Sequence, residues 1–241
     1  AYYAFIRNPR YNSRGLNTSA ILGFTNTLVE VLEKENPSHI AVAFDTSKPT
    51  FRNEIYEEYK ANREQMPEDI QKSIPYIKEI LKAFNIPMIQ VEGFEADDVI
   101  GTLAHKAKDQ SFETYMMTPD KDYGQLLEEK IYMYKPRRSG NEVEILDKNK
   151  ICTRFNIENP EQIIDIMALM GDKSDNIPGA PGIGEKTAVK LIGQFGSIEN
   201  LYKNINELKG KQKEKLNENK DQVKLSKELV KINLNVPIEF S

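Results

Sequence analysis

Residues 93–108 read GFEADDVIGTLAHKAK, and three of the first six side chains are carboxylates. Acidic side chains at the start of a helix satisfy free N–H groups and favour the positive end of the helix dipole, but one is enough. Apolar residues follow at helical spacing, so one face of this helix is expected to be buried. Glu95, Asp97 and Asp98 therefore crowd like charge at the edge of a core. This arrangement predicts either helix capping or a bound cation.

Length and composition set the broad class. The chain has 241 residues, a formal net charge of −4 and no apolar run close to the length of a membrane span, so we expect a soluble protein. The single Cys152 excludes an internal disulfide and is compatible with the cytoplasm. The net charge disfavours nucleic acid, but residues 203–231 carry nine lysines against five acids, so this helical surface permits DNA binding.

Periodicity divides the chain near residue 150. Helical stripes alternate with strand-like runs in residues 1–150, which predicts an α/β fold with a mostly parallel sheet flanked by helices. Residues 46–75 are irregular and read as a short helical insertion, and residues 151–241 show only helical patterns, so we expect a helical second domain. The expected helices include 18–35, 74–84, 147–155, 160–170 and 185–195, and the expected strands are 39–45, 87–92, 113–118 and 130–135.

Acidic residues follow three of the expected strands, where ligands bind in parallel sheets. Two more lie three positions apart in a loop, where a helical turn would point them the same way. Oxygen donors without a cysteine pair or a suitable histidine motif favour two or more Mg²⁺ or Mn²⁺ ions, and two such ions can promote phosphodiester hydrolysis. The candidate metal ligands are Asp45, Glu95, Asp97, Asp98, Asp120, Asp122, Asp172 and Asp175.

Basic and glycine-rich segments complement these acids. Arg52, Lys60 and Arg63 lie in the insertion, and the spacing of the last two predicts a shared helix face, although a merely solvated insertion is the plain alternative. The run PGAPGIG at 178–184 precedes a helix, and its glycines permit positive φ and close approach of a phosphate to N–H groups. With the helix that follows, it resembles the hairpin of a helix-hairpin-helix element, which binds the DNA backbone without sequence preference.

Five segments in order resemble the flap-endonuclease and 5′–3′ exonuclease family, and within it the 5′ nuclease domain of bacterial DNA polymerase I, over nearly the whole chain. They are AVAFD, TFRNEIYEEYKANR, EGFEADDVIGTLA, TPDKDYGQL and GDKSDNIPGAPGIGEKTAVKLI. The resemblance implies a PIN-like flap-nuclease core that hydrolyses DNA at 5′ ends, flaps and nicks in replication and repair, including primer removal. It implies a monomer near the nucleoid, with DNA as substrate and polymerase domains in the same chain.

The resemblance also assigns roles to the residues. It implies that the eight acids bind metal and that the insertion forms a helical arch. Lys60 and Arg63 would act in catalysis and, with Arg52, position the strand. The hairpin would bind duplex DNA through Gly182, Gly184 and Lys186, and a K⁺ ion is often held there in the family.

One departure and two alternatives accompany this assignment. The family begins with a strand that carries an aspartate, whereas this sequence begins at AYYAF, which looks like the aromatic region that follows that strand. We therefore expect little nuclease activity from these residues alone, and recovery when such a strand is restored with its aspartate. A non-catalytic binder of branched DNA and a PIN-like ribonuclease are the alternative functions. Cleavage assays with Mg²⁺, and with flapped DNA against single-stranded RNA, separate them.

Overall fold

A computed structural model describes residues 9–136 and 143–239, so the run AYYAF lies outside the described residues. The chain forms two compact units. The first contains residues up to 44 together with 64–90, and the second contains 45–63 together with 91–241. The boundaries of these units differ from the domain boundary that the sequence predicts near residue 150. That boundary stays a prediction.

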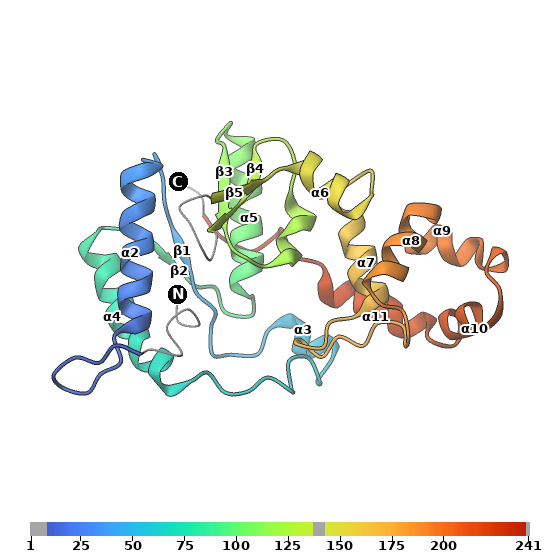
Figure 1. Ribbon diagram of the computed structural model, residues 1–241, viewed down its shortest axis with the longest axis horizontal. Coiled ribbons are helices and arrows are strands. Elements are labelled where there is room, and N and C mark those ends of the chain that lie inside the picture. Colours follow the sequence, from blue (N-terminus) through green and yellow to red (C-terminus); the bar gives the residue numbers. More distant parts are fainter. Residues whose placement is uncertain (1–8, 137–142, 240–241) are drawn as a thin grey trace. The chain divides into compact units, whose positions relative to one another are not determined.

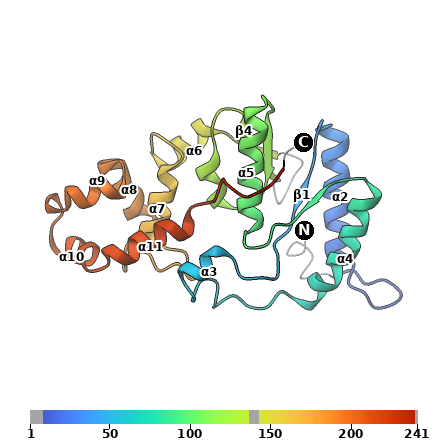
Figure 2. The same ribbon diagram turned by 180° about the vertical axis from the view of Figure 1, so that it is seen from behind.

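The first unit is a pair of helices beside two short parallel strands. Helices α2 (Ser19–Lys34) and α4 (Glu68–Ala83) lie side by side in both views (Figures 1 and 2). Strand β1 (Val42–Ala43) pairs in parallel with β2 (Met88–Ile89). Helix α4 begins earlier than the predicted residue 74. The prediction misses its start because residues 68–73 are polar except for Ile70 and show no apolar periodicity.

The second unit contains a three-stranded sheet covered by α5 (Ala96–Asp109), the helix of the opening motif (Figure 1). Strand β3 (Thr114–Met117) pairs in parallel with β4 (Ile131–Pro136), which pairs antiparallel with β5 (Val143–Leu146). The α/β class with parallel pairing is thus confirmed. A single sheet is not found among the described strands, and β5 escapes the sequence prediction.

The rest of the second unit is helical, as predicted. Helix α7 (Gln162–Met170) packs against α8 (Glu185–Phe195) and α11 (Lys220–Val230), and Leu169, Leu191 and Leu229 are buried. The other elements are α3 (Phe51–Ile55), η1 (Lys121–Leu126), α6 (Lys148–Phe155), α9 (Ile198–Lys203), η2 (Ile205–Glu207) and α10 (Gly210–Glu218). No helix in the described ranges is both long and apolar enough to pass through a lipid bilayer.

Two glycines let the end of α7 approach the loop before α8. Gly171 and Gly179 both have positive φ, 69° and 60°. A Cβ at Gly179 would lie 2.3 Å from the backbone nitrogen of Gly171, closer than atoms can pack. This approach fixes the two ends of the loop that contains Asp172 and Asp175.

We therefore predict that Gly179→Ala lowers the free energy of unfolding by at least about 1–3 kcal/mol, the usual cost of a strained backbone. Urea unfolding measures the change. Gly184→Ala is the matched control, because Gly184 has φ −93° and a Cβ there meets no atom within 4 Å. Equal losses in the two variants would contradict the role given to the close approach.

Candidate active site

Arg52 and Asp98 form a buried ion pair at the base of the site. The Arg52 guanidinium donates to both oxygens of Asp98 at 2.7 and 2.8 Å, and the two residues are 2% and 0% exposed. Burial opposes the charge on Arg52, but the bonds and charge of Asp98 outweigh burial and raise the pKa of Arg52. The backbone N–H groups of Glu95 and Asn233 also donate to Asp98.

This geometry corrects two expectations. The oxygens of Asp98 already accept four hydrogen bonds, so Asp98 is a partner of Arg52 and not a metal ligand. Arg52 also donates to the carbonyl oxygens of Leu229 and Lys231, each at 2.8 Å, so its donors face the protein and not DNA. Sequence spacing cannot show this burial.

Glu95 and Asp175 meet the insertion. Lys60 Nζ lies 2.6 Å from Glu95 and 3.7 Å from Asp175, and Arg63 Nη2 lies 2.5 Å from Asp175. The Tyr59 hydroxyl lies 3.2 Å from Glu95 and 3.4 Å from Asp175. Two cations and one hydroxyl therefore gather at two carboxylates that are far apart in the sequence.

Lys60 and Arg63 converge without sharing a helix face. Lys60 has φ 58° and lies in a turn, so the predicted helical spacing is wrong. The backbone N–H of Lys60 donates to the carbonyl of Asp175 at 2.9 Å, and Asn62 donates to the carbonyl of Lys173 at 2.7 Å. These bonds dock the insertion on the loop between α7 and α8.

Asp97 lies within a second group of carboxylates. Its Oδ1 accepts a 2.6 Å hydrogen bond from the Tyr123 hydroxyl. Burial is the main cause that raises the pKa of Asp97 to about 6, and the Tyr123 hydrogen bond opposes this rise. The charges of Glu95, Asp120 and Asp45 add to it, so these carboxylates lie within electrostatic reach of Asp97. Asp45 also accepts from the first N–H of α5 at 2.8 Å.

Asp122 is poorly compensated by its surroundings. Its Oδ1 is buried and has no hydrogen-bond partner among the described residues. Burial raises the pKa of Asp122 to about 8, with further contributions from the charges of Asp120, Asp172 and Asp175, while Lys121 opposes the rise. A carboxylate in this position requires either a proton or a cation.

Asp172 is held by its own loop. Burial raises its pKa, but hydrogen bonds from the backbone and hydroxyl of Ser174 lower it and prevail. Lys121 Nζ lies 3.7 Å from Asp172. The loop closes through a bridge between Asp172 and Ile177 and is not helical, so the two aspartates do not share a helical turn.

The carboxylates thus form two overlapping groups. The charges of Asp45, Glu95 and Asp120 raise the pKa of Asp97. The charges of Asp120 and of the two aspartates in the α7–α8 loop raise the pKa of Asp122. No three Asp, Glu, His or Cys side chains in the described part of the chain already surround one point as a metal cage. The donor set fits hard cations, because it consists of carboxylate oxygens and includes the unpartnered, buried Oδ1 of Asp122.

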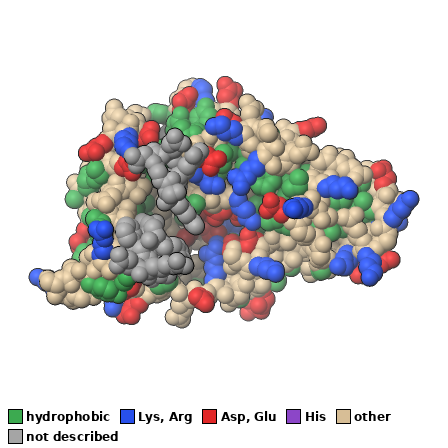
Figure 3. Space-filling model, viewed as in Figure 1, with side chains coloured by type: hydrophobic (Ala, Val, Ile, Leu, Met, Phe, Trp, Pro, Cys, Tyr) green, Lys and Arg blue, Asp and Glu red, His purple; other side chains and the backbone are tan. Residues whose placement is uncertain are grey.

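The glycine-rich loop reaches α8 as predicted, and α8 begins at Glu185. Gly182 has φ 81°, and a Cβ there would lie 2.5 Å from Lys215 Nζ of α10. Lys186 is exposed on the first turn of α8. Gly184 has φ −93°, so this glycine does not use the positive φ that its residue type permits. Figure 3 shows Lys and Arg side chains spread over the C-terminal helices, at the right of the view.

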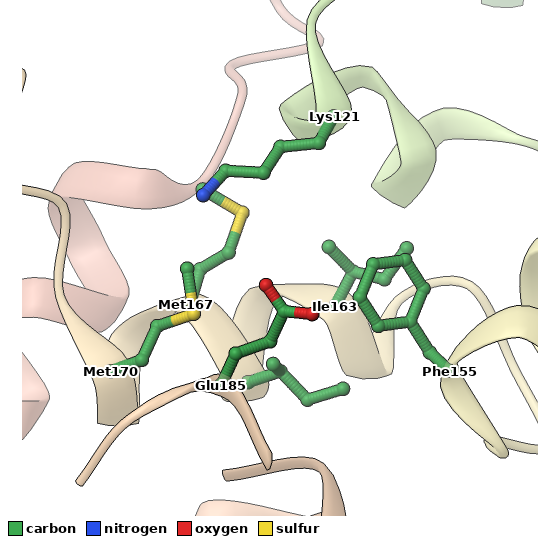
Figure 4. A pocket seen from close by; sticks show the side chains of 7 residues that line it. Lys121, Phe155, Ile163, Met167, Met170 and Glu185 are labelled. Carbon is green, nitrogen blue, oxygen red and sulfur yellow. The ribbon is translucent and has the colours of Figure 1, made fainter.

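A small apolar pocket lies beside the carboxylates. Lys121 reaches towards it from η1, Glu185 projects into it from α8, and Phe155 and Met170 form part of its walls (Figure 4). Its volume of about 10 Å³ suits one water molecule and not a nucleotide. We therefore place the chemistry at the gathered carboxylates and not in this pocket.

Sequence reasoning misses two hydroxyl groups that touch the acids. Tyr59 and Tyr123 are 4% and 2% exposed, and both belong to the main core cluster. Each adjoins a residue that the sequence does single out, Lys60 and Asp122. That adjacency is the available signal, but an aromatic residue in a core-forming segment usually indicates packing alone.

The α/β fold, the gathered carboxylates that face two cations and the helical C-terminal region are the features by which the chain can be placed in a family. A model described as the "5'-3' exonuclease, N-terminal resolvase-like domain" matches residues 1–156, and one described as the "5'-3' exonuclease, C-terminal SAM fold" matches residues 158–241. The chain belongs to the 5'-3' exonuclease family.

Known proteins resemble the chain over almost all its length. It is 43% identical to a DNA polymerase I of Bacillus caldotenax over all of this chain and 28% of that relative, so it spans little more than a quarter of it. It is 38% identical to a 5'-3' exonuclease of Aquifex aeolicus, over 98% of the chain and 79% of the relative. A solved bacteriophage T5 flap endonuclease, in a pseudo-enzyme-product complex with DNA and metal ions, has a TM-score of 0.72 at 26% identity and covers 95% of this chain and 85% of that one.

We predict that Arg52→Met destabilises the fold by about 3–5 kcal/mol, because it leaves the Asp98 charge buried without its partner. Arg52→Met combined with Asp98→Leu should recover most of this loss, since no isolated charge then remains. Chemical unfolding of the 241-residue chain measures both variants. Lys224→Met, which breaks an exposed pair with Asp221, is the control and should change little. A single variant as stable as the parent would contradict the structural role of the pair.

Proposed function

We propose that the chain is a metal-dependent, structure-specific 5′ nuclease that hydrolyses phosphodiester bonds at the 5′ ends and flaps of DNA. It would serve as the 5′–3′ exonuclease domain of a DNA polymerase I in replication and repair, with polymerase domains in the same natural chain. The observation that carries this proposal is the pair of overlapping carboxylate groups, which face the cations of the insertion.

We infer that the carboxylates hold two or more Mg²⁺ or Mn²⁺ ions. A divalent pair, when bound, supplies an activated water and stabilises the leaving oxygen. Two overlapping groups that share Asp120 suit two neighbouring ion positions. Asp98 is omitted from the proposed ligands for the reason given above. The proposed ligands are Asp45, Glu95, Asp97, Asp120, Asp122, Asp172 and Asp175.

Lys60 and Arg63 would position the scissile phosphate and stabilise the charge that develops on it. Their ammonium and guanidinium groups lie 2.6 and 2.5 Å from the carboxylates of Glu95 and Asp175, at the border of the proposed metal site. A phosphate held next to these carboxylates comes within reach of both cations. Contacts that strengthen in the transition state lower the barrier, so these groups act mainly on the chemical step.

The glycine-rich loop and α8 would bind the duplex through its backbone, as a helix-hairpin-helix element does. Gly182 allows a close approach, while Lys186 and Lys215 bring positive charge to the same turn. A K⁺ ion held by carbonyl oxygens of this turn is part of the proposal. Such contacts carry no base specificity, which suits an enzyme that recognises DNA shape.

A cleavage assay on a labelled 5′-flap DNA tests the proposal, with the full natural protein, that is, these 241 residues and any sequence that flanks them. We predict cleavage with Mg²⁺, none with EDTA, and a loss of at least about 100-fold in Asp122→Asn, which keeps its affinity for the flap. The reason is that the variant removes one anionic ligand. Binding without cleavage by the parent would favour the branched-DNA binder, and faster cleavage of single-stranded RNA would favour the ribonuclease.

The insertion gives a separate prediction. Lys60→Ala and Arg63→Ala should each slow single-turnover cleavage by about 100-fold or more and leave duplex affinity nearly unchanged. Lys48→Ala is the matched control, because Lys48 lies in the same insertion but pairs with Glu92 at 2.8 Å, outside the carboxylate groups. Parent-like rates for the first two variants would show that the insertion is a merely solvated segment without a role in cleavage.

A further inference from the structure

The Tyr123 hydroxyl is attached to a rigid part of the protein and touches one proposed ligand. Its residue is 2% exposed, and its ring belongs to the main core cluster of the second unit. The hydroxyl donates to Asp97 Oδ1 at 2.6 Å. Among the described residues, the bond from Tyr123 is the hydrogen bond found at the Asp97 carboxylate, and none is found at its other oxygen. Asp97 is therefore tethered on one side and open on the other.

The bond also joins two elements of the proposed site. Asp97 lies in the first turn of α5, whereas Tyr123 follows Asp122 directly in η1. The same short helix thus carries one acid and the hydroxyl that holds another. Because the Tyr123 ring is buried, its hydroxyl oxygen cannot move away from Asp97 without a shift of the ring within the core. The bond consequently sets the direction of the Asp97 carboxylate relative to Asp122.

We propose that Tyr123 is a positioning residue that orients the free oxygen of Asp97 towards a divalent cation. The inference rests on the proposed metal-dependent function and goes beyond it, since it names a group outside the ligand set. Hydrogen bonds to ligating carboxylates fix their orientation, and their removal typically costs about 10–100-fold in metal affinity or activity.

A purely structural role makes a different prediction. A buried hydroxyl needs a partner in any case, and Asp97 would then only satisfy it. Removing the hydroxyl would lower stability and leave metal affinity unchanged. Tyr202 offers the matched comparison, because its hydroxyl donates to the carbonyl of Leu216 at 3.0 Å, between α9 and α10. Loss of that bond affects packing among helices that contribute none of the proposed ligands.

The test measures Mn²⁺ binding by titration calorimetry on the full natural protein, with Tyr123→Phe and Tyr202→Phe compared with the parent. We expect Tyr123→Phe to weaken Mn²⁺ binding about 10–100-fold. Tyr202→Phe should bind Mn²⁺ like the parent. Thermal midpoints without metal should fall by similar small amounts in the two variants, since each loses one hydrogen bond. The midpoint rise caused by Mn²⁺ should shrink only in Tyr123→Phe.

Each outcome decides between the roles. Parent-like Mn²⁺ affinity in Tyr123→Phe overturns the inference and leaves the proposed function intact. Should Tyr123→Phe fail to fold, Asp97→Asn replaces it. In that variant the amide oxygen still accepts the hydrogen bond from Tyr123, but the anionic ligand is lost. Unchanged affinity in Asp97→Asn would leave Tyr123 with no ligand to position and would also overturn the inference. A parent that binds no Mn²⁺ overturns the proposed function itself.

Discussion

The buried pair between Arg52 and Asp98 holds the parts of the site in place. Arg52 belongs to α3, inside the insertion, and Asp98 belongs to the first turn of α5. The same guanidinium also binds the carbonyls of Leu229 and Lys231, so the segment that follows α11 is fixed to both elements. Glu95 caps the start of α5 and therefore meets the insertion at a defined place. Without the pair, α3 and α5 would lose the buried contact that holds them in the positions that bring Lys60 to Glu95.

Above this pair, the protein concentrates negative charge and compensates it unevenly. Glu95 and Asp175 face cations, Asp97 has a hydroxyl partner, and Asp172 is held by its own loop. Asp122 keeps a buried oxygen without a partner among the described residues. Such an arrangement is costly for the fold alone, because buried carboxylates that repel one another take up protons. It is favourable when divalent cations are bound, which connects the energetics of the site with the proposed chemistry.

Much of this architecture follows from local sequence patterns. The apolar period predicts α8 to the residue, and the acids do follow strands in a parallel arrangement. Sequence patterns do not predict the parts of the site whose geometry depends on contacts between residues far apart in the chain. Asp98 pairs with Arg52 across 46 positions, and Lys60 reaches Glu95 through a left-handed turn that no periodicity encodes. In the sequence Tyr123 has the features of a core residue, and its contact with Asp97 is visible only in three dimensions.

The central claim is that carboxylates from α5, η1 and the α7–α8 loop share divalent cations. An anomalous difference map from crystals of the full natural protein grown with Mn²⁺ tests it most directly, because the map locates each ion without reference to activity. We predict two or more peaks beside the carboxylates, with Asp97, Asp120 and Asp122 within ligand distance and Asp98 still paired with Arg52. Peaks only at other positions, or none at a saturating Mn²⁺ concentration, would contradict the claim.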